Sequence, residues 1–213
     1  MTDNFKAFRQ YIESQFELID PQNRDDSYFV VELIRRGKDC PDLPAANYHF
    51  KNYYIRKITD LDGYEEEIKF LCDNLRMRAY ISVSVKSFKQ VTLDTLAELA
   101  RRVANSDFKK NYNVYESCSG SYKHNSFKRW VVDIDNPKEG TVEEIIKNVN
   151  DVAPTGTDKV IMQIPTKSGV HLITTPFDVY RFNALCICKS HFDSANDIPD
   201  IKKNHVSLLY ENL

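Results

Sequence analysis

Two short apolar runs that lie close together in the chain constrain its fold more than any other feature. Residues 159–165 (KVIMQIP) and 169–175 (GVHLITT) are rich in strand-forming residues, and only Thr166, Lys167 and Ser168 separate them. A connection this short joins antiparallel strands, because parallel neighbours need a crossover of about a dozen residues or more. We therefore expect an antiparallel hairpin here, which excludes a sheet that is parallel throughout.

The other apolar residues recur with the period of a helix in some segments and alternate like a strand in others. Helices are expected over roughly 3–18, 64–75, 91–105 and 142–150, with another starting near 177. Strands are expected over 27–36, 53–60, 77–85, 130–135 and 205–210. This interleaving and the late hairpin predict the α+β class, with a mixed or antiparallel sheet that has helices on one side.

Two lobes are expected within this chain. Residues 1–75 form a small N-terminal α/β lobe of unknown role, and residues 76–213 form a larger core. The polar stretch 105–126 is the longest segment without an apolar period, so it is predicted to be a lobe boundary or a substrate loop.

The composition favours a cytoplasmic protein without membrane contact. A net charge of −2 gives no global sign of nucleic-acid binding. The five cysteines are odd in number and lack C-x-x-C spacing, which argues against a disulfide framework and a zinc ribbon and favours a reducing compartment. The N-terminus lacks the apolar core of a signal peptide, and no apolar run is long enough to cross a bilayer.

The run WVVDID places two carboxylates in an otherwise apolar strand. Side chains alternate between the two faces of a strand, so Asp133 and Asp135 point the same way as Val131, while Val132 and Ile134 point to the other face. Two adjacent carboxylates repel each other unless a cation lies between them. Hard divalent ions such as Mg²⁺ and Mn²⁺ prefer oxygen ligands, so this pair is a candidate metal site for phosphate chemistry.

A second D-x-D sequence, Asp60-Leu61-Asp62, tests how specific this pattern is. It precedes Gly63 and the expected start of a helix, where aspartates commonly cap helices and form turns. A structural role is therefore predicted for Asp60 and Asp62.

The hairpin itself carries a further group of polar residues. The turn Lys167-Ser168-Gly169 offers a cation, a hydroxyl and backbone amides that suit an anion, and His171 follows within the apolar strand. Further along, Asp200 precedes Lys202 and Lys203 and a terminal strand.

These three segments resemble the three-motif pattern of the archaeo-eukaryotic primase superfamily. VVDID resembles the first motif, KSGVH the second and IPDIKKNHVSLLY the third, in the same order. Residues 76–213 as a whole look like small primase-like proteins of phages and bacteria. The resemblance implies an RRM-like catalytic sheet flanked by helices, and a location in the cytoplasm of a bacterium or a phage-infected host.

The resemblance also implies a reaction. A metal-dependent nucleotidyltransferase of DNA primase or polymerase type would let a 3′-hydroxyl attack the α-phosphorus of a nucleotide and release pyrophosphate. Two divalent ions, Mg²⁺ or Mn²⁺, would be held by Asp133, Asp135 and Asp200. Asp197 is an alternative third acid, because Pro199 takes the place of the usual apolar residue before Asp200.

Four residues are implied to bind the incoming nucleotide: His171, Ser168, Lys167 and Lys203. Lys202 and Lys203 would neutralise the triphosphate or the template. The implied partners are nucleoside triphosphates, a single-stranded DNA or RNA template and a replication protein.

Two other functions remain open from the sequence. His124-Asn125-Ser126 and His205-Val206-Ser207 both have the form H-x-S, which in pairs marks two-histidine phosphoesterases that use one histidine as base and one as acid. Alternatively, the chain is a non-catalytic relative of the primase fold, in which aromatic side chains stack on bases or on a partner protein. The candidate aromatic residues are Tyr112, Tyr115, Tyr122 and Trp130.

Overall fold

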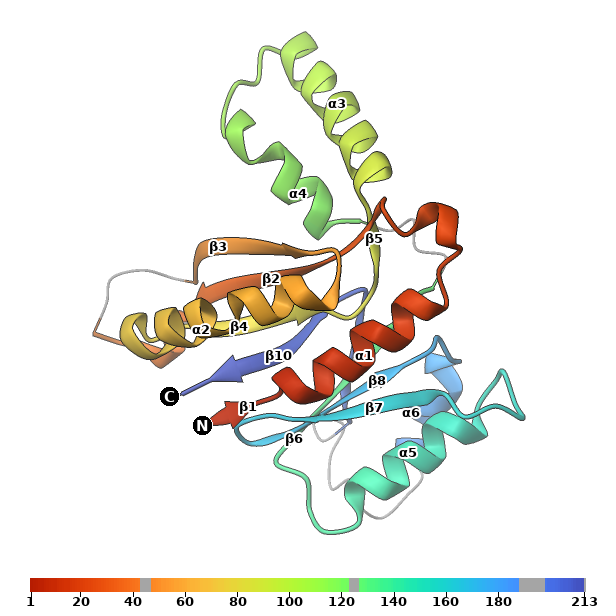
Figure 1. Cartoon of the computed structure of the whole chain (residues 1–213). Helices are drawn as coiled ribbons and strands as arrows, with labels where there is room; N and C mark the ends of the chain where they lie inside the picture. Colours follow the sequence, from red (N-terminus) through yellow and green to blue (C-terminus); the bar gives the residue numbers. More distant parts are fainter. Residues whose placement is uncertain (43–46, 123–126, 188–197, 213) are drawn as a thin grey trace.

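The computed structural model describes residues 1–42, 47–122, 127–187 and 198–212. Two antiparallel sheets lie one above the other, with helices packed against both and one pair of helices projecting from the body (Figure 1). The predicted α+β class is confirmed. None of the helices in these described ranges is long and apolar enough to cross a bilayer.

The first sheet combines strands from both expected lobes. Its neighbouring strands are, in order, β1 (Thr2–Asp3), β10 (Val206–Glu211), β4 (Arg78–Ser82), β2 (Ser27–Arg35) and β3 (Tyr48–Ile55), with β5 (Lys86–Ser87) paired to the start of β2. The last strand, β10, therefore lies between the first strand and β4, and the two ends of the chain lie side by side. The expected division at residue 75 does not coincide with a break in this sheet.

Two helices pack against one face of the first sheet. They are α1 (Phe5–Glu17) and α2 (Ile58–Leu75), and they share a core with inward-facing strand residues such as Leu33 and Ile81. The expected helix over 64–75 begins six residues earlier, and the strand expected over 53–60 ends at Ile55. The difference arises because Asp60 accepts hydrogen bonds from the backbone N–H groups of Arg56 and Lys57, which fixes the first turn of α2.

The second sheet has the topology of an RRM. Its strands run in the order β7 (Val160–Pro165), β8 (Gly169–Thr174), β6 (Trp130–Asp135) and β9 (Asp200–Lys203), and all neighbours are antiparallel. Helices α5 (Thr141–Asp151) and α6 (Val179–Ile187) follow β6 and β8, which gives the chain order β-α-β-β-α-β. The predicted hairpin is the pair β7 and β8, and the RRM-like arrangement is confirmed.

The two faces of this sheet are buried in different ways. Val132 and Ile134 pack with α5 and α6. On the other face, Val131 and Ile173 join the core that contains α1 and the first sheet. The second sheet is thus mostly apolar on its helix side, whereas its other side is apolar only where it meets the first sheet.

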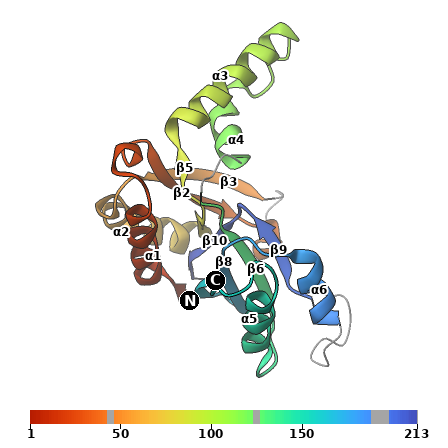
Figure 2. The ribbon, with the colours of Figure 1, turned by 90° about the vertical axis from the view of Figure 1, so that its right-hand side faces the viewer.

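A helical hairpin projects from the body (Figure 2). It consists of α3 (Phe88–Ala104) and α4 (Val114–Gly120), joined by a connection that contains a 3₁₀ turn at Asn111–Asn113. The stretch 105–126 was expected to lack regular structure, and α4 corrects that expectation. The helix is short and carries a single buried apolar residue, Val114, so its apolar period is too weak to detect in the sequence.

Candidate functional site

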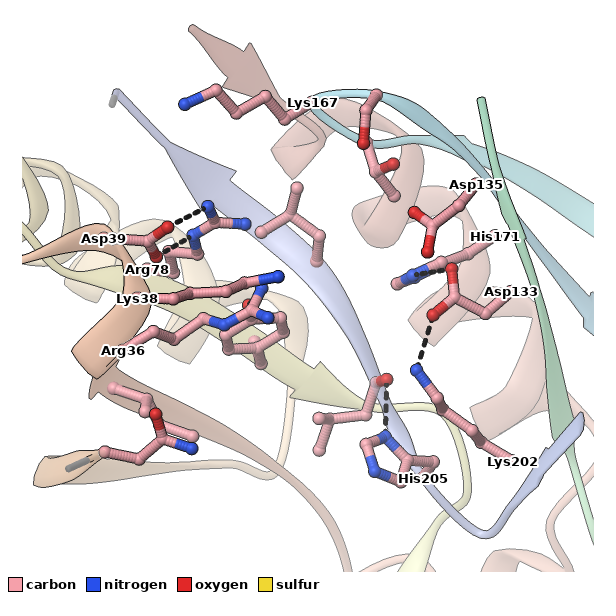
Figure 3. A pocket seen from close by; sticks show the side chains of 17 residues that line it. Arg36, Lys38, Asp39, Arg78, Asp133, Asp135, Lys167, His171, Lys202 and His205 are labelled. Carbon is pink, nitrogen blue, oxygen red and sulfur yellow. Dashed lines mark hydrogen bonds and ion pairs between the residues drawn. The ribbon is translucent and has the colours of Figure 1, made fainter. Parts of the chain in front are cut away.

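A cleft of about 460 Å³ lies where the open end of the second sheet faces the first sheet (Figure 3). Its walls come from strands and turns that are far apart in the sequence. The polar residues that line it are Arg36, Lys38, Asp39, Asn47, Arg78, Tyr80, Asp133, Asp135, Thr166, Lys167, Ser168, His171, Lys202 and His205.

The acidic wall of the cleft is formed by β6. Asp133 and Asp135 both face the cleft, as the alternation of the strand predicts, while Val132 and Ile134 are buried on the helix side. The backbone register places Asp133 between His171 on β8 and Asp200 on β9. Three separate segments that the sequence singled out therefore meet on one face of one sheet.

A chain of polar contacts crosses from one sheet to the other at this point. The Nε2 atom of His171 lies 3.2 Å from Oδ1 of Asp133, and its Nδ1 atom lies 2.9 Å from the hydroxyl oxygen of Ser207. Ser207 is fully buried and belongs to β10 of the first sheet. The imidazole is held from both sides, so its ring orientation is fixed by the packing of the two sheets.

Lys202 supplies the other contact of Asp133. Its ammonium donates a hydrogen bond to Oδ2 of Asp133 at 2.5 Å and lies 3.9 Å from Oδ2 of Asp200. Burial alone would raise the pKa of the Asp133 carboxyl, but the hydrogen bonds from His171 and Lys202 outweigh burial and hold this pKa well below its usual range. Asp133 is therefore ionised and fully paired.

The opposite wall is basic and comes from the first sheet. Arg36 and Lys38 lie at the end of β2 and in the 3₁₀ turn Gly37–Asp39 that follows it, and both point toward the acidic wall (Figure 3). Arg78 lies deeper and is already neutralised, because it forms ion pairs with Asp39 at 2.8 Å and with Glu211 at 3.0 Å.

Among the described residues, three cations of the cleft have no carboxylate partner: Arg36, Lys38 and Lys167. Arg36 donates a hydrogen bond to the Tyr80 hydroxyl at 3.4 Å. The cleft therefore has one wall with unpaired positive charge and one wall with carboxylates.

The turn between β7 and β8 forms the rim of the cleft. Gly169 is required here, because a Cβ atom at this position would lie 1.9 Å from the backbone oxygen of Ile134. This close approach is what lets Thr166, Lys167 and Ser168 line the cleft next to Asp135. The backbone carbonyl of Ser168 accepts a hydrogen bond from the backbone N–H of Asn136 at 2.8 Å, which connects the rim to the end of β6.

The expected site residues are not all brought together. Lys203 lies on the other face of the sheet, where its ammonium is 4.8 Å from the centre of the Trp130 ring, and Lys202 takes the place in the cleft instead. Asp200 is on the correct face, but its side chain is 73% exposed. Asp197 and His124 lie outside the described residues.

The carboxylates also do not close around a common centre. Within the described ranges, no three side chains of histidine, cysteine, aspartate or glutamate are grouped closely enough to hold a metal ion. The second D-x-D sequence behaves as predicted: Asp60 caps α2, and Asp62 pairs with Arg9 at 2.6 Å.

Sequence reasoning missed the basic wall of the cleft and the buried serine behind His171. Arg36 and Lys38 follow an apolar strand in the run Arg-Arg-Gly-Lys, and this basic cluster directly after a strand is a signal that could have been used. Ser207 was noticed only as part of an H-x-S sequence, and nothing local in the sequence indicates its contact with His171.

The comparisons with known proteins give no support for any family. No family model matches the chain, and no curated protein and no solved structure gives a significant match.

Proposed function

We propose that the cleft binds a nucleoside triphosphate together with divalent metal, and that the protein transfers the nucleotidyl group to the 3′-hydroxyl of a nucleic acid. The observation that carries this proposal is that the two walls of the cleft face each other with different chemistry. One wall carries Asp133, Asp135 and His171, and the opposite wall carries Arg36 and Lys38, which have no carboxylate partner among the described residues. A polyphosphate bridging two such walls would meet cations at one end and metal-binding carboxylates at the other.

The residue types of the site support Mg²⁺ or Mn²⁺, and the carboxylates would have to draw together around the ion. Carboxylate oxygens are the preferred ligands of these ions, and Asp133, Asp135 and Asp200 would hold them. The Lys202 ammonium already lies between Asp133 and Asp200, so the site accommodates a cation at that place. Lysine is flexible and 30% exposed here, and it would have to move away when metal enters. Bound metal would lower the pKa of the attacking hydroxyl and neutralise charge on the phosphates.

The protein's own residues would position the substrate. Arg36 and Lys38 would bind the terminal phosphates, and Lys167 with Ser168 would contact them from the rim. His171 would give up its contact with Asp133 and donate a hydrogen bond from Nε2 to a phosphate oxygen, while Ser207 keeps the ring in place. Because both walls come from packed strands, the phosphates would be held without a large change of fold.

The test is incorporation of a labelled nucleotide on primed and unprimed single-stranded DNA and RNA, with Mn²⁺ and with Mg²⁺. We expect incorporation by the wild type and loss of about a thousandfold or more in Asp133→Asn/Asp135→Asn. The matched control is Asp60→Asn/Asp62→Asn, which changes the other D-x-D sequence and should retain activity. If the wild-type protein incorporates no nucleotide with either metal and with any of the templates, the proposed nucleotidyltransferase activity is refuted.

A second candidate is a non-catalytic nucleotide- or nucleic-acid-binding protein. The observation that favours it is the complete pairing of Asp133 with Lys202 and His171, which leaves this carboxylate neutralised without metal. Calorimetric titration separates the two candidates: nucleotide binding that is independent of Mn²⁺ and is not followed by incorporation would favour the binding protein.

The two-histidine phosphoesterase remains a prediction from the sequence. His205 lines the cleft, and His124 is outside the described residues. Activity on cyclic phosphates that survives EDTA and is lost in His205→Ala would favour this function.

A further inference from the structure

Helix α3 has its amphipathic pattern reversed relative to an ordinary surface helix. Only Val91 at its base is buried, and the partly buried side of the helix carries polar residues such as Asp94, Glu98 and Arg102. The exposed side is mostly apolar, with Lys89, Thr92 and Arg101 as its polar members. Leu99 is an apolar residue on the partly buried side. We call the exposed apolar set the α3 stripe: Leu93, Leu96, Ala97, Ala100, Val103 and Ala104.

Such a stripe is unfavourable in an isolated surface helix. A helix normally turns its apolar residues to the core and its charged residues to water. Here Leu96 and Val103 are each 58% exposed, on a helix that projects from the body (Figure 2). Phe108 and Tyr112, in the connection to α4, are also largely exposed. Apolar surface gathered on one projecting element marks an interaction surface.

The spacing of the stripe indicates another helix as the occupant. Leu93, Leu96, Ala100 and Val103 follow steps of three, four and three residues, which is the a/d pattern of a helix–helix seam. The adjacent Ala97 and Ala104 are small and would let a second helix approach closely. The cation that lies beside the stripe, Arg101, is paired with Glu98 at 2.7 Å, so the stripe offers no free cation to a phosphate backbone.

We propose that the occupant is α3 of a second copy of this chain, paired antiparallel about a two-fold axis near Glu98. In that register Leu93 faces the partner's Val103, and Leu96 faces the partner's Ala100, so each leucine meets a smaller residue. Antiparallel pairing also brings Lys89, in the first turn of α3, near the partner's Asp107, which follows the end of α3 at Ala104. Both charged residues are exposed, and neither has an ion-pair partner among the described residues, so the stripe is complementary to itself in charge as well as in shape.

The shape of the molecule favours the antiparallel pairing over a parallel one. Helix α3 leaves the body at its N-terminal end and spans about 25 Å for its 17 residues. Antiparallel pairing places the two bodies at opposite ends of the helix pair, whereas parallel pairing would place them side by side. No residue of α3 lines the cleft, so the dimer leaves the cleft open and does not depend on the proposed function.

The test is sedimentation equilibrium or light scattering of the full chain over a range of concentrations. We expect a dimer for the wild type, and a dissociation constant raised about a hundredfold or more in Leu96→Glu, with an unchanged circular dichroism spectrum. Leu18→Glu is the matched control, because Leu18 is also about half exposed but lies outside α3, and it should remain dimeric.

The charge pair tests the register. Lys89→Glu and Asp107→Lys should each raise the dissociation constant by roughly three- to thirtyfold, since two symmetric pairs are affected in each dimer. The double variant Lys89→Glu/Asp107→Lys should restore the wild-type value. A wild type that is monomeric at every concentration, or a dimer that Leu96→Glu leaves intact, would overturn the proposal. If Leu96→Glu abolishes the dimer but the charge substitutions leave its dissociation constant unchanged, the antiparallel register is overturned.

Discussion

Two segments of this protein share the sequence Asp-x-Asp but place it in different structures. Asp60 lies in the first turn of α2 and caps the helix, whereas Asp62 lies in the next turn and pairs with the partly exposed Arg9. Asp133 and Asp135 lie on one face of β6 and line a cleft between two sheets. A spacing of two residues places side chains together on a strand and apart on a helix, so the surrounding periodicity decides what the pattern means.

Each segment also has its own cation and its own glycine. Arg9 pairs with Asp62, and Lys202 pairs with Asp133. Gly63 lies within α2 with open space around it, whereas Gly169 lies opposite Asp135 in tight contact with the backbone. Matched substitutions at these pairs therefore test whether the two segments differ in packing and in metal binding.

The largest effect is expected at the glycines, and with opposite signs. Gly169→Ala should destabilise the fold by about 3 kcal/mol or more, because its Cβ would overlap the Ile134 carbonyl. Gly63→Ala should stabilise it by about 0.5–1 kcal/mol, because alanine favours the helix and meets no neighbour. Urea denaturation measures both. Equal effects of the two substitutions would show that the turn beside Asp135 is not tightly packed.

The next effect concerns the carboxylates. Asp133→Asn should lower the free energy of unfolding at pH 7 by about 1–3 kcal/mol, since it removes charge from two buried hydrogen bonds. Asp62→Asn should cost less than about 1 kcal/mol, as expected for an exposed pair.

The pH dependence sharpens this second prediction. The pKa of Asp133 is lowered in the folded state, so its contribution is complete above the unfolded carboxyl's pKa of about 4 and is lost as the pH falls toward the folded pKa. The difference between wild type and Asp133→Asn should therefore shrink between about pH 5 and pH 2. A difference that stays constant over that range would contradict the pairing described for Asp133.

A smaller effect is expected at the two cations, and it rests on the proposed function. Lys202→Met should tighten Mn²⁺ binding by up to about tenfold, because it frees the carboxylates of Asp133 and Asp200. Arg9→Met should leave Mn²⁺ binding unchanged. Electron paramagnetic resonance of free Mn²⁺ gives both values, and weaker Mn²⁺ binding in Lys202→Met would argue against metal at this place.

The smallest effect is expected at the helix cap. Asp60→Ala should lower the free energy of unfolding by about 0.5–1 kcal/mol, through the loss of two hydrogen bonds from backbone N–H groups. It should change neither Mn²⁺ binding nor nucleotide incorporation. A loss of incorporation in a well-folded Asp60→Ala protein would place Asp60-Leu61-Asp62 in the active centre as well.

The sequence was informative where a property is local. The alternation in WVVDID predicted which side chains of β6 face the cleft, and the short link between two apolar runs predicted the β7–β8 hairpin. The order of elements predicted the α+β class, and the primase resemblance implied the RRM-like sheet.

The sequence was uninformative where residues meet through long-range pairing. Nothing near Ser207 indicates that β10 lies beside β4 and brings this hydroxyl to His171. Lys202 and Lys203 look equivalent in the sequence, and only the register of β9 against β6 places one in the cleft and the other over Trp130. The basic wall was missed because Arg36 and Lys38 belong to the other sheet.

The position of β10 has a consequence for how the protein is made. During synthesis on a ribosome, residues 206–211 emerge after every other described strand, yet they lie between β1 and β4. Until then the nascent chain exposes two unpaired strand edges and His171 lacks its buried serine. A translation arrest before this segment would thus leave an aggregation-prone polypeptide with an unfinished cleft, so chaperones should engage the nascent chain during this interval.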